Sequence, residues 1–482
     1  MSLRVILRIL GLLLMLFSLT LVPPILISLL FNDGVWDAFA IAMAITVATG
    51  ALLYLPNRYA RKELRTRDGF LIAALFWTVL GTFGSLPLML DGPYALSVTD
   101  AVFESFSGLT TTGATVITGI DFLPEAVRYY RQQLQWLGGM GIVVLAVAIL
   151  PTLGVGGMAL YRTEIPGPLK DSKLTPRITE TAKALWYIYA SLTLTCIIAY
   201  WAAGMDWFDA IGHGFSTVAI GGFSTYDASI GHFDSATIEM ICVLFMVISA
   251  ISYSLHFAAW REKRLSQYLR DPEARFLLLF LLGLSVISVL TLWLTATYSG
   301  SEGLRNGVFQ AVSIATTAGF GVADFAAWPG ALPFLLFVAA FVGGCSGSTG
   351  GGMKVIRIIL ILKQGMREVM RLIHPNAVIA VKVGKVSVPD GIAQAVWGFF
   401  SVYVMLFFLM LIGVMATGVD QVTAWSTVAS TLNNLGPALG EAASHYGELP
   451  DLAKWILVLA MILGRLEIFT VLVLFTPAFW RR

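Results

Sequence analysis

Long apolar runs alternate with short polar segments along the whole chain. Each run has about the 20 residues that an α-helix needs to cross the hydrocarbon layer of a membrane. The pattern predicts ten such helices, over 9–31, 36–55, 70–90, 133–157, 184–204, 236–260, 275–298, 331–362, 392–417 and 453–478. We therefore expect an all-α polytopic membrane protein, in which irregular backbone at membrane depth faces protein or water.

A second pattern repeats four times between these runs. Each copy ends in a glycine, has a serine six residues earlier, and begins with a polar residue that suits a helix N-cap. The glycines are Gly113, Gly222, Gly319 and Gly436, the serines are Ser107, Ser216, Ser313 and Ser430, and the expected caps are Asp100, Asp209, Asn306 and Thr423. We interpret each copy as a short re-entrant helix and loop between two spanning helices.

The two patterns together predict the division of the chain. Two N-terminal transmembrane helices occupy 1–66, and four repeats of the form M1-P-M2, with a re-entrant pore loop P between helices M1 and M2, follow over 67–165, 166–268, 269–375 and 376–482. Four such repeats can surround one pore with fourfold pseudo-symmetry.

The loops have the chemistry of a cation site. Helices that run inward from their caps direct the partial negative charge of their C-terminal ends to a common centre. Loop carbonyl oxygens can then replace the hydration shell of an ion, and glycine permits the positive φ that aims them. The alternative is that the glycines only let helices pack closely. The candidate filter residues are Thr111, Thr112, Gly113, Ile220, Gly221, Gly222, Thr317, Ala318, Gly319, Asn434, Leu435 and Gly436.

Composition and charge agree with a membrane protein. Hydrophobic residues make up 57% of the chain and charged residues 12%, and the net charge is only +2. Most Lys and Arg lie at the termini and in 58–67, 162–183, 261–275 and 357–385, which places that side and both termini in the cytoplasm. These basic segments are either topology signals or binding sites for lipid or a partner. On the outer side, Asp100, Glu104 and Asp121 are expected to concentrate cations, unless Asp100 only caps a helix.

The segment 343–352 contains six glycines in ten residues and should interrupt the span that contains it. It does not have the residue order of a phosphate-binding loop, so it is either a close-packing patch or a movable intramembrane gate. Arg465, in the last apolar run, is expected either to hold this segment by its carbonyls or to form a buried ion pair with another helix; Glu467 projects to a different face. The candidate gate residues are Gly344, Ser346, Gly347, Gly350, Gly351, Gly352 and Arg465.

Several of these motifs resemble those of the TrkH family, the membrane subunits of bacterial Trk potassium uptake systems in the Trk/Ktr/HKT superfamily. They are 103–115 (FESFSGLTTTGAT), 131–141 (RQQLQWLGGMG), 221–224 (GGFS), 317–320 (TAGF), 343–354 and 434–437 (NLGP). The resemblance covers essentially the whole chain. It implies potassium as the substrate and the only metal, bound at the filter, without an organic cofactor.

The resemblance further implies a homodimer in the lipid bilayer of the bacterial inner membrane. It implies a cytosolic nucleotide-binding regulatory ring similar to TrkA, and no nucleic-acid partner. We therefore expect potassium uptake through a gated, channel-like pore. The alternative is a secondary symporter that couples potassium to protons or sodium. An enzyme is not expected, because no paired nucleophile and base are visible in the sequence.

Overall fold

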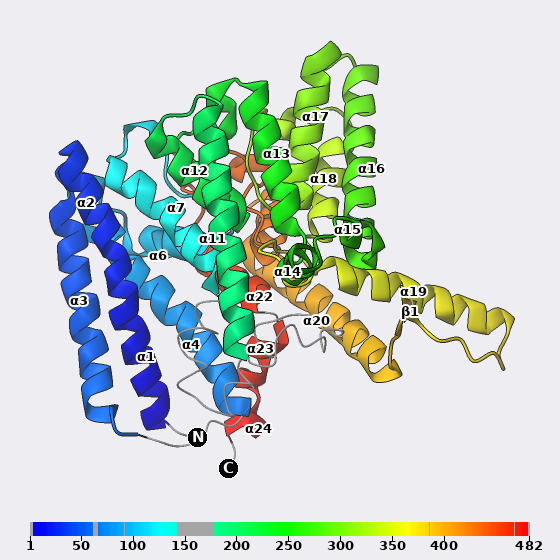
Figure 1. Cartoon of the computed structure of the whole chain (residues 1–482), viewed down its shortest axis with the longest axis horizontal. Helices are drawn as coiled ribbons and strands as arrows, with labels where there is room; N and C mark the ends of the chain where they lie inside the picture. Colours follow the sequence, from blue (N-terminus) through cyan, green and yellow to red (C-terminus); the bar gives the residue numbers. More distant parts are fainter. Residues whose placement is uncertain are drawn as a thin grey trace.

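A computed structural model describes residues 3–60, 66–90, 92–141, 178–384, 386–466 and 468–480 of the chain. Within these ranges the regular structure is helical except for one small antiparallel pair, β1 (Lys382–Val383) and β2 (Val386–Ser387). Helices lie side by side across the molecule, and α19 (Val355–Ile373) with the β-pair extends away from it (Figure 1). The all-α expectation is therefore confirmed for these residues.

The N-terminal part is a pair of apolar helices at one edge of the molecule (Figure 1). It consists of α1 (Leu3–Ser18) and α2 (Val22–Phe31), joined by η1 (Leu19–Leu21), and of α3 (Trp36–Tyr54), followed by η2 (Leu55–Asn57). Glycines allow α1 and α3 to approach closely, because a Cβ built on Gly11 would lie 2.6 Å from the carbonyl oxygen of Gly50.

The rest of the described chain repeats one order of elements, a long helix, a short helix and a further helix. The first set is α4 (Thr66–Gly84) with α5 (Leu86–Leu90), α6 (Val98–Leu109) and α7 (Glu125–Gly139). The second is α11 (Ile178–Ala202), α12 (Trp207–Ala219) and α13 (Ala236–Ala250), followed by α14 (Tyr253–Glu262) and α15 (Ser266–Arg270).

The third set is α16 (Pro272–Leu294), α17 (Gly300–Ala315) and α18 (Leu332–Ala340), followed by α19. The fourth is α20 (Asp390–Met415), α21 (Gln421–Leu432) and α22 (Asp451–Leu466), followed by α23 (Ile468–Leu472) and α24 (Pro477–Trp480). Single 3-10 turns lie in the connections, at η3 (Gly92–Tyr94), η4 (Ile120–Phe122), η6 (Ser229–Phe233), η7 (Phe325–Ala327), η8 (Gly440–Ala442) and η9 (Val473–Phe475). The boundaries of the four repeats stay a prediction.

Within the described residues, six helices are long and apolar enough to span a membrane: Leu3–Phe31, Trp36–Asn57, Asp68–Leu90, Lys183–Ala202, Pro272–Leu294 and Asp390–Met415. The bent pair α13 and α14 is a possible seventh. Within the described residues, the expected spans over 331–362 and 453–478 are each interrupted. The span expected over 453–478 is divided between α22, α23, η9 and α24, and that over 133–157 lies outside the described residues beyond 141.

The prediction of a single helix over 236–260 is wrong. Helix α13 ends at Ala250 and α14 begins at Tyr253, with a bend of 92° between them. The backbone groups that this bend exposes are satisfied by a distant segment, because Cys345 N donates to Ala250 O at 2.8 Å and Tyr253 N donates to Gly347 O at 3.0 Å. An apolar sequence alone does not reveal such a partner.

Candidate functional site

The four short helices α6, α12, α17 and α21 begin earlier than the sequence suggested. The residues that precede them are Ser97, Asp206, Ser299 and Asp420, not the expected caps Asp100, Asp209, Asn306 and Thr423. In three of the four, the expected cap is instead the backbone donor to the true cap, as in Asp209 N to Asp206 Oδ1 at 2.8 Å. In those three helices the first turn contains two polar residues three positions apart, and only the first ends the extended chain, whereas in α17 Ser299 precedes the expected cap Asn306 by seven positions.

The C-terminal ends of the four short helices share one hydrogen-bond pattern. In each, the backbone N–H of the residue before the repeated glycine donates to the carbonyl of the repeated serine, and the preceding residue has a left-handed conformation. This is a Schellman motif, and it explains the fixed spacing of serine and glycine. The bonds join Thr112 to Ser107, Gly221 to Ser216, Ala318 to Ser313 and Leu435 to Ser430 at 2.8, 2.9, 2.8 and 2.8 Å, and the left-handed residues are Thr111, Ile220, Thr317 and Asn434.

The glycine that follows each motif also has positive φ, between 80° and 100°. We call the four segments 110–113, 219–222, 316–319 and 433–436 the glycine turns. A Cβ built on each glycine would strike a backbone carbonyl oxygen of the next turn. The contacts are Gly113 to Gly221 O at 2.1 Å, Gly222 to Ala318 O at 2.2 Å, Gly319 to Leu435 O at 2.1 Å and Gly436 to Thr112 O at 2.6 Å. The four turns thus form a closed ring of contacts in chain order, and the twelve candidate filter residues lie in it.

Side chains of α7, of the ring itself and of the loop before α22 hold the ring. Gln135 of α7 donates from Nε2 to Gly221 O at 2.6 Å and accepts from Phe223 N at 3.1 Å, so it fixes both sides of the second glycine turn. Asn434 donates to Thr112 Oγ1 at 3.0 Å, which joins the fourth turn to the first. Tyr446 donates to Gly436 O at 2.8 Å. Sequence reasoning missed these contacts, although polar residues such as Gln135 in an apolar run were a usable signal.

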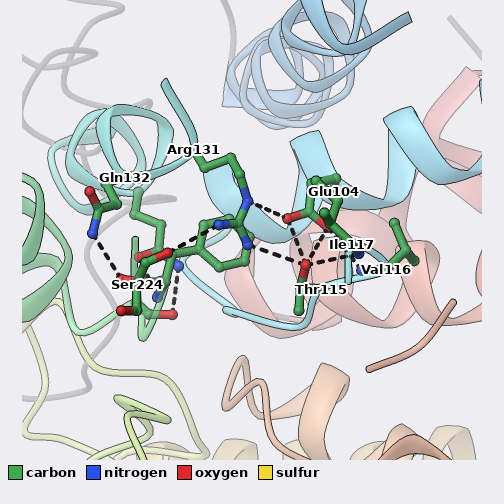
Figure 2. A network of polar contacts seen from close by, with 10 residues as sticks. Glu104, Thr115, Val116, Ile117, Arg131, Gln132 and Ser224 are labelled. Atoms are coloured by element: carbon green, nitrogen blue, oxygen red, sulfur yellow. Dashed lines mark hydrogen bonds and ion pairs between the residues drawn. The ribbon is translucent and has the colours of Figure 1, made fainter. Parts of the chain in front are cut away.

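Glu104 and Arg131 form a buried ion pair behind the ring, shown in Figure 2. Arg131 donates from Nε to Glu104 Oε1 at 2.7 Å, and its guanidinium lies over the ring of Phe223. The same carboxylate accepts from Thr115 Oγ1 and from Val116 N, and Arg131 also reaches Ser224 O at 3.2 Å. The pair therefore joins the chain after the first glycine turn to the chain after the second.

This geometry corrects the expected role of Glu104. Its side chain is 0% exposed, so it does not concentrate cations in solution at an outer mouth. Asp100 also has a partner, because Lys454 Nζ donates to its Oδ1 at 2.6 Å. Asp121 differs from both in being exposed. The sequence showed an outer carboxylate but not the arginine 27 positions away that neutralises it.

Polar side chains of the other short helices hold the chain after the glycine in a similar way. Gln310 accepts from Val322 N at 3.3 Å, and Ser426 accepts from Leu439 N at 2.9 Å. In the second set, the His213 Nε2 atom lies 2.8 Å from Ser224 Oγ. Together with Glu104, which accepts from Val116 N, these contacts hold the chain after all four glycine turns.

The glycine-rich segment (residues 343–352) breaks the helix as expected, since α18 ends at Ala340 and α19 begins at Val355. Its backbone bonds to the ends of the short helices and to the glycine turns. Gly351 N donates to Thr317 Oγ1 at 2.7 Å, and Gly352 N donates to Asn433 O at 3.0 Å. Thr349 donates from Oγ1 to Val218 O at 2.9 Å. The segment therefore lies directly against three of the four helix ends.

The remaining candidate gate residues contact the supporting helices. Ser346 N donates to the Glu273 carboxylate, and Gly347 O accepts from Tyr253 N. Gly350 O accepts from Lys354 Nζ. Gly344 N donates to Gly351 O at 3.4 Å, which brings the two ends of the segment together.

Arg465 of α22 joins the glycine-rich segment to the first set of helices. It donates from Nη1 to Thr349 O at 3.0 Å and from Nη2 to Gly138 O at 2.9 Å. Gly138 in turn packs against the end of α6, because a Cβ built there would lie 1.7 Å from Leu109 O. The expected hydrogen bond between Arg465 and the segment is thus present, whereas the orientation of Glu467 lies outside the described residues.

A cavity of about 40 Å³ lies beside this contact, with room for a few water molecules. Its lining includes Gly351 of the segment and three basic side chains, Lys354, Arg357 and Arg465. The guanidinium of Arg357 lies 4.2 Å from the centre of the Phe399 ring, which also lines the cavity. Three basic side chains therefore lie around the space next to the segment.

Comparisons with known proteins agree over the whole chain. The model of the TrkH family, described as cation transport proteins, matches residues 36–482. A protein of Halomonas elongata named Trk system potassium uptake protein TrkH is 83% identical over the full length of both chains, and one of the same name from Escherichia coli K12 is 55% identical over both full chains. A crystal structure described as the potassium transporter TrkH from Vibrio parahaemolyticus has a TM-score of 0.91 and 53% identity over both full chains. The chain therefore belongs to the TrkH family, which is a family of membrane cation transporters and not of enzymes.

Proposed function

We propose that this chain takes up potassium through a channel-like pore, with the ring of glycine turns as its selectivity filter. The closed ring of backbone contacts is the observation that carries this proposal. The names of the relatives, potassium uptake proteins and a potassium transporter, support potassium as the ion.

The chemistry of the ring favours a cation. Four short helices end at the ring, and their C-terminal carbonyls carry partial negative charge. The turns that follow contain carbonyl oxygens that can replace water around an ion. Side-chain carboxylates are not needed, and Glu104 is already paired with Arg131. Selectivity then depends on the spacing of backbone atoms, which Gln135 and Tyr446 fix through carbonyl oxygens of the ring and which the bond from Asn434 to Thr112 Oγ1 fixes between two turns.

The glycine-rich segment is the proposed gate. It bonds to the inner ends of the helices through Thr317, Asn433 and Val218, so an ion that leaves the ring on this side meets backbone instead of open water. Arg465 holds the segment by Thr349 O and places a positive charge next to it. The gate opens when the segment leaves these contacts, and at least four hydrogen bonds oppose that movement.

We also propose the membrane, the orientation and the partners of the pore. Helix α1 begins and α24 ends at the same end of the molecule (Figure 1), which fits an even number of crossings with both termini in the cytoplasm. The protein then lies in a bacterial inner membrane as a homodimer, and a cytosolic nucleotide-binding ring similar to TrkA regulates the segment from the inner side.

Flux into proteoliposomes tests this function. We expect potassium-selective flux that follows the membrane potential and does not change when a pH or sodium gradient is imposed. Arg465→Ala should raise the flux without the cytosolic partner and leave the potassium to sodium ratio unchanged, because the filter lies elsewhere. Arg465→Lys should restore the charge but only part of the anchoring, since it lacks the planar fork.

Two results would overturn parts of the proposal. Equal flux for wild type, Arg465→Ala and Arg465→Lys would remove Arg465 from the gate. Flux that requires a proton or sodium gradient would replace the channel by a symporter.

A further inference from the structure

The segment α14–α15 (residues 253–270) has an exposed surface that the proposed pore does not use. Four basic residues and one acidic residue occupy 261–270, and Arg261, Arg264 and Arg270 are exposed. Large apolar side chains lie exposed beside them, with Trp260 at 75%, Leu265 at 81% and Leu269 at 70%. Exposed aromatic and leucine side chains next to arginines are typical of a helix that lies in a membrane interface.

The chain at and just beyond both ends of α14–α15 bonds to the glycine-rich segment. At the first end, Ala250 O accepts from Cys345 N at 2.8 Å and Tyr253 N donates to Gly347 O at 3.0 Å. At the other end, Glu273 in the first turn of α16 accepts from Ser346 N. The three consecutive residues 345–347 are therefore held by the two flanks of one surface segment. In Figure 1, α14 and α15 lie next to each other at the end of α16 where that helix begins.

His256 makes the surface segment one unit. Its Nε2 lies 2.9 Å from Ile248 O in α13, and its Nδ1 lies 2.9 Å from the Tyr268 hydroxyl in α15. The neutral ring with hydrogen on Nε2 satisfies both contacts, because a carbonyl oxygen can only accept. The imidazole thus ties α15 to the end of α13, so a displacement of the arginines moves the flanks that hold 345–347.

We propose that α14–α15 binds the anionic lipid surface of the cytoplasmic leaflet and that this binding holds the glycine-rich segment in the position seen here. The charge of 261–270 complements acidic headgroups, and Trp260, Leu265 and Leu269 suit the boundary between headgroups and acyl chains. The regulatory part rests on the proposed gate, whereas the lipid contact does not.

Lipid binding to the full-length protein tests the contact directly. Native mass spectrometry would count phosphatidylglycerol molecules retained from mixed micelles by the wild type and by a variant with Arg261→Gln, Arg264→Gln and Arg270→Gln. A matched control carries Arg58→Gln, Arg371→Gln and Lys382→Gln, which removes the same charge from other exposed sites. The test variant should bind on the order of 100-fold more weakly, since each basic residue contributes about fivefold. Equal retention by all three proteins, or an equal loss in the control, would overturn the proposal.

Potassium flux then tests the regulation. In vesicles where half of the lipid is phosphatidylglycerol, the wild type and the control should show lower basal flux than in pure phosphatidylcholine. The test variant should show the same high flux in both. Lipid-independent flux in the wild type would overturn the regulatory part. A complete lack of potassium flux in every vesicle would refute the proposed function, while the retention measurement would still decide the lipid contact. A test variant that retains lipid but loses its response to the cytosolic subunit would assign the surface to a protein partner instead.

Discussion

Replacing Glu104 by glutamine should destabilise the protein strongly, although the two side chains have nearly the same shape. The carboxylate accepts from Arg131 Nε at 2.7 Å and from Val116 N at 3.0 Å, on different oxygens. A glutamine amide can place only one oxygen there. In either orientation its NH₂ group faces another donor. Thr115 Oγ1 cannot accept from this NH₂ group, because it already accepts from Ile117 N and Arg131 Nη2.

The expected loss is about 3–5 kcal/mol of unfolding free energy, the usual result of removing one partner from a buried pair. Arg131 would be left 1% exposed without its counter-charge. Because the pair joins the chains after two glycine turns, potassium flux should fall together with stability. The fall should be nearly the same at low and high ionic strength, since salt screens a buried pair much less than an exposed one.

The measurement is chemical unfolding of the purified protein together with flux at two ionic strengths. Asp121→Asn is the matched control, because this carboxylate is exposed; it should change stability by less than about 0.5 kcal/mol. A double variant with Glu104→Gln and Arg131→Gln should lose less than the sum of the single variants. If Glu104→Gln unfolds like the wild type and loses flux only at low ionic strength, Glu104 is a mouth charge and the argument from burial is wrong.

Three further predictions concern the ring and the proposed gate. Gly113→Ser places a Cβ about 2.1 Å from Gly221 O at a φ of +81°, so the potassium to sodium permeability ratio should fall; an unchanged ratio would exclude Gly113 from the filter. Thr317→Val leaves Gly351 N without its acceptor, at a cost of about 1–3 kcal/mol to the closed state, so basal flux should rise about fivefold or more while Thr317→Ser stays near wild type. Deleting residues 345–350 joins ends that already lie within hydrogen-bond distance and should raise both potassium and sodium flux; a folded but closed deletion variant would count against the gate.

The repeated spacing of serine and glycine made the ring predictable, because it reflects one backbone motif used four times. The sequence could not show which residue has the left-handed conformation. Thr111 and Ile220 adopt it although neither is glycine, since the next hydrogen bond and the packing of the ring compensate for the unfavourable φ. The N-caps were misplaced by one turn in three helices for a similar reason, namely two candidate residues in one turn.

Long-range partners were the least predictable part of the site. Arg465 was expected to bond to the glycine-rich segment because a charge in an apolar run needs a partner. Nothing in the sequence indicated Gly138 as its second acceptor. The bend after Ala250 was missed because apolar residues continue through it, and its unpaired backbone groups are satisfied about 100 residues later. The hydrophobic pattern of a sequence indicates which residues a segment can bury. It does not indicate which distant backbone groups will replace the helical hydrogen bonds where the helix bends.

In the gate that we propose, the contacts of the glycine-rich segment would allow one of the four sets to control all of them. The segment bonds directly to the ends of the second, third and fourth short helices, through Val218 O, Thr317 Oγ1 and Asn433 O. Arg465 supplies the fourth connection, because Gly138 lies against the end of α6. A symmetric ring can bind a dehydrated ion from all sides, but a symmetric plug would need four segments to move together. A single segment could open the path by one displacement. Because the segment is hydrogen-bonded to the ring, a movement of the segment would also act on the ring.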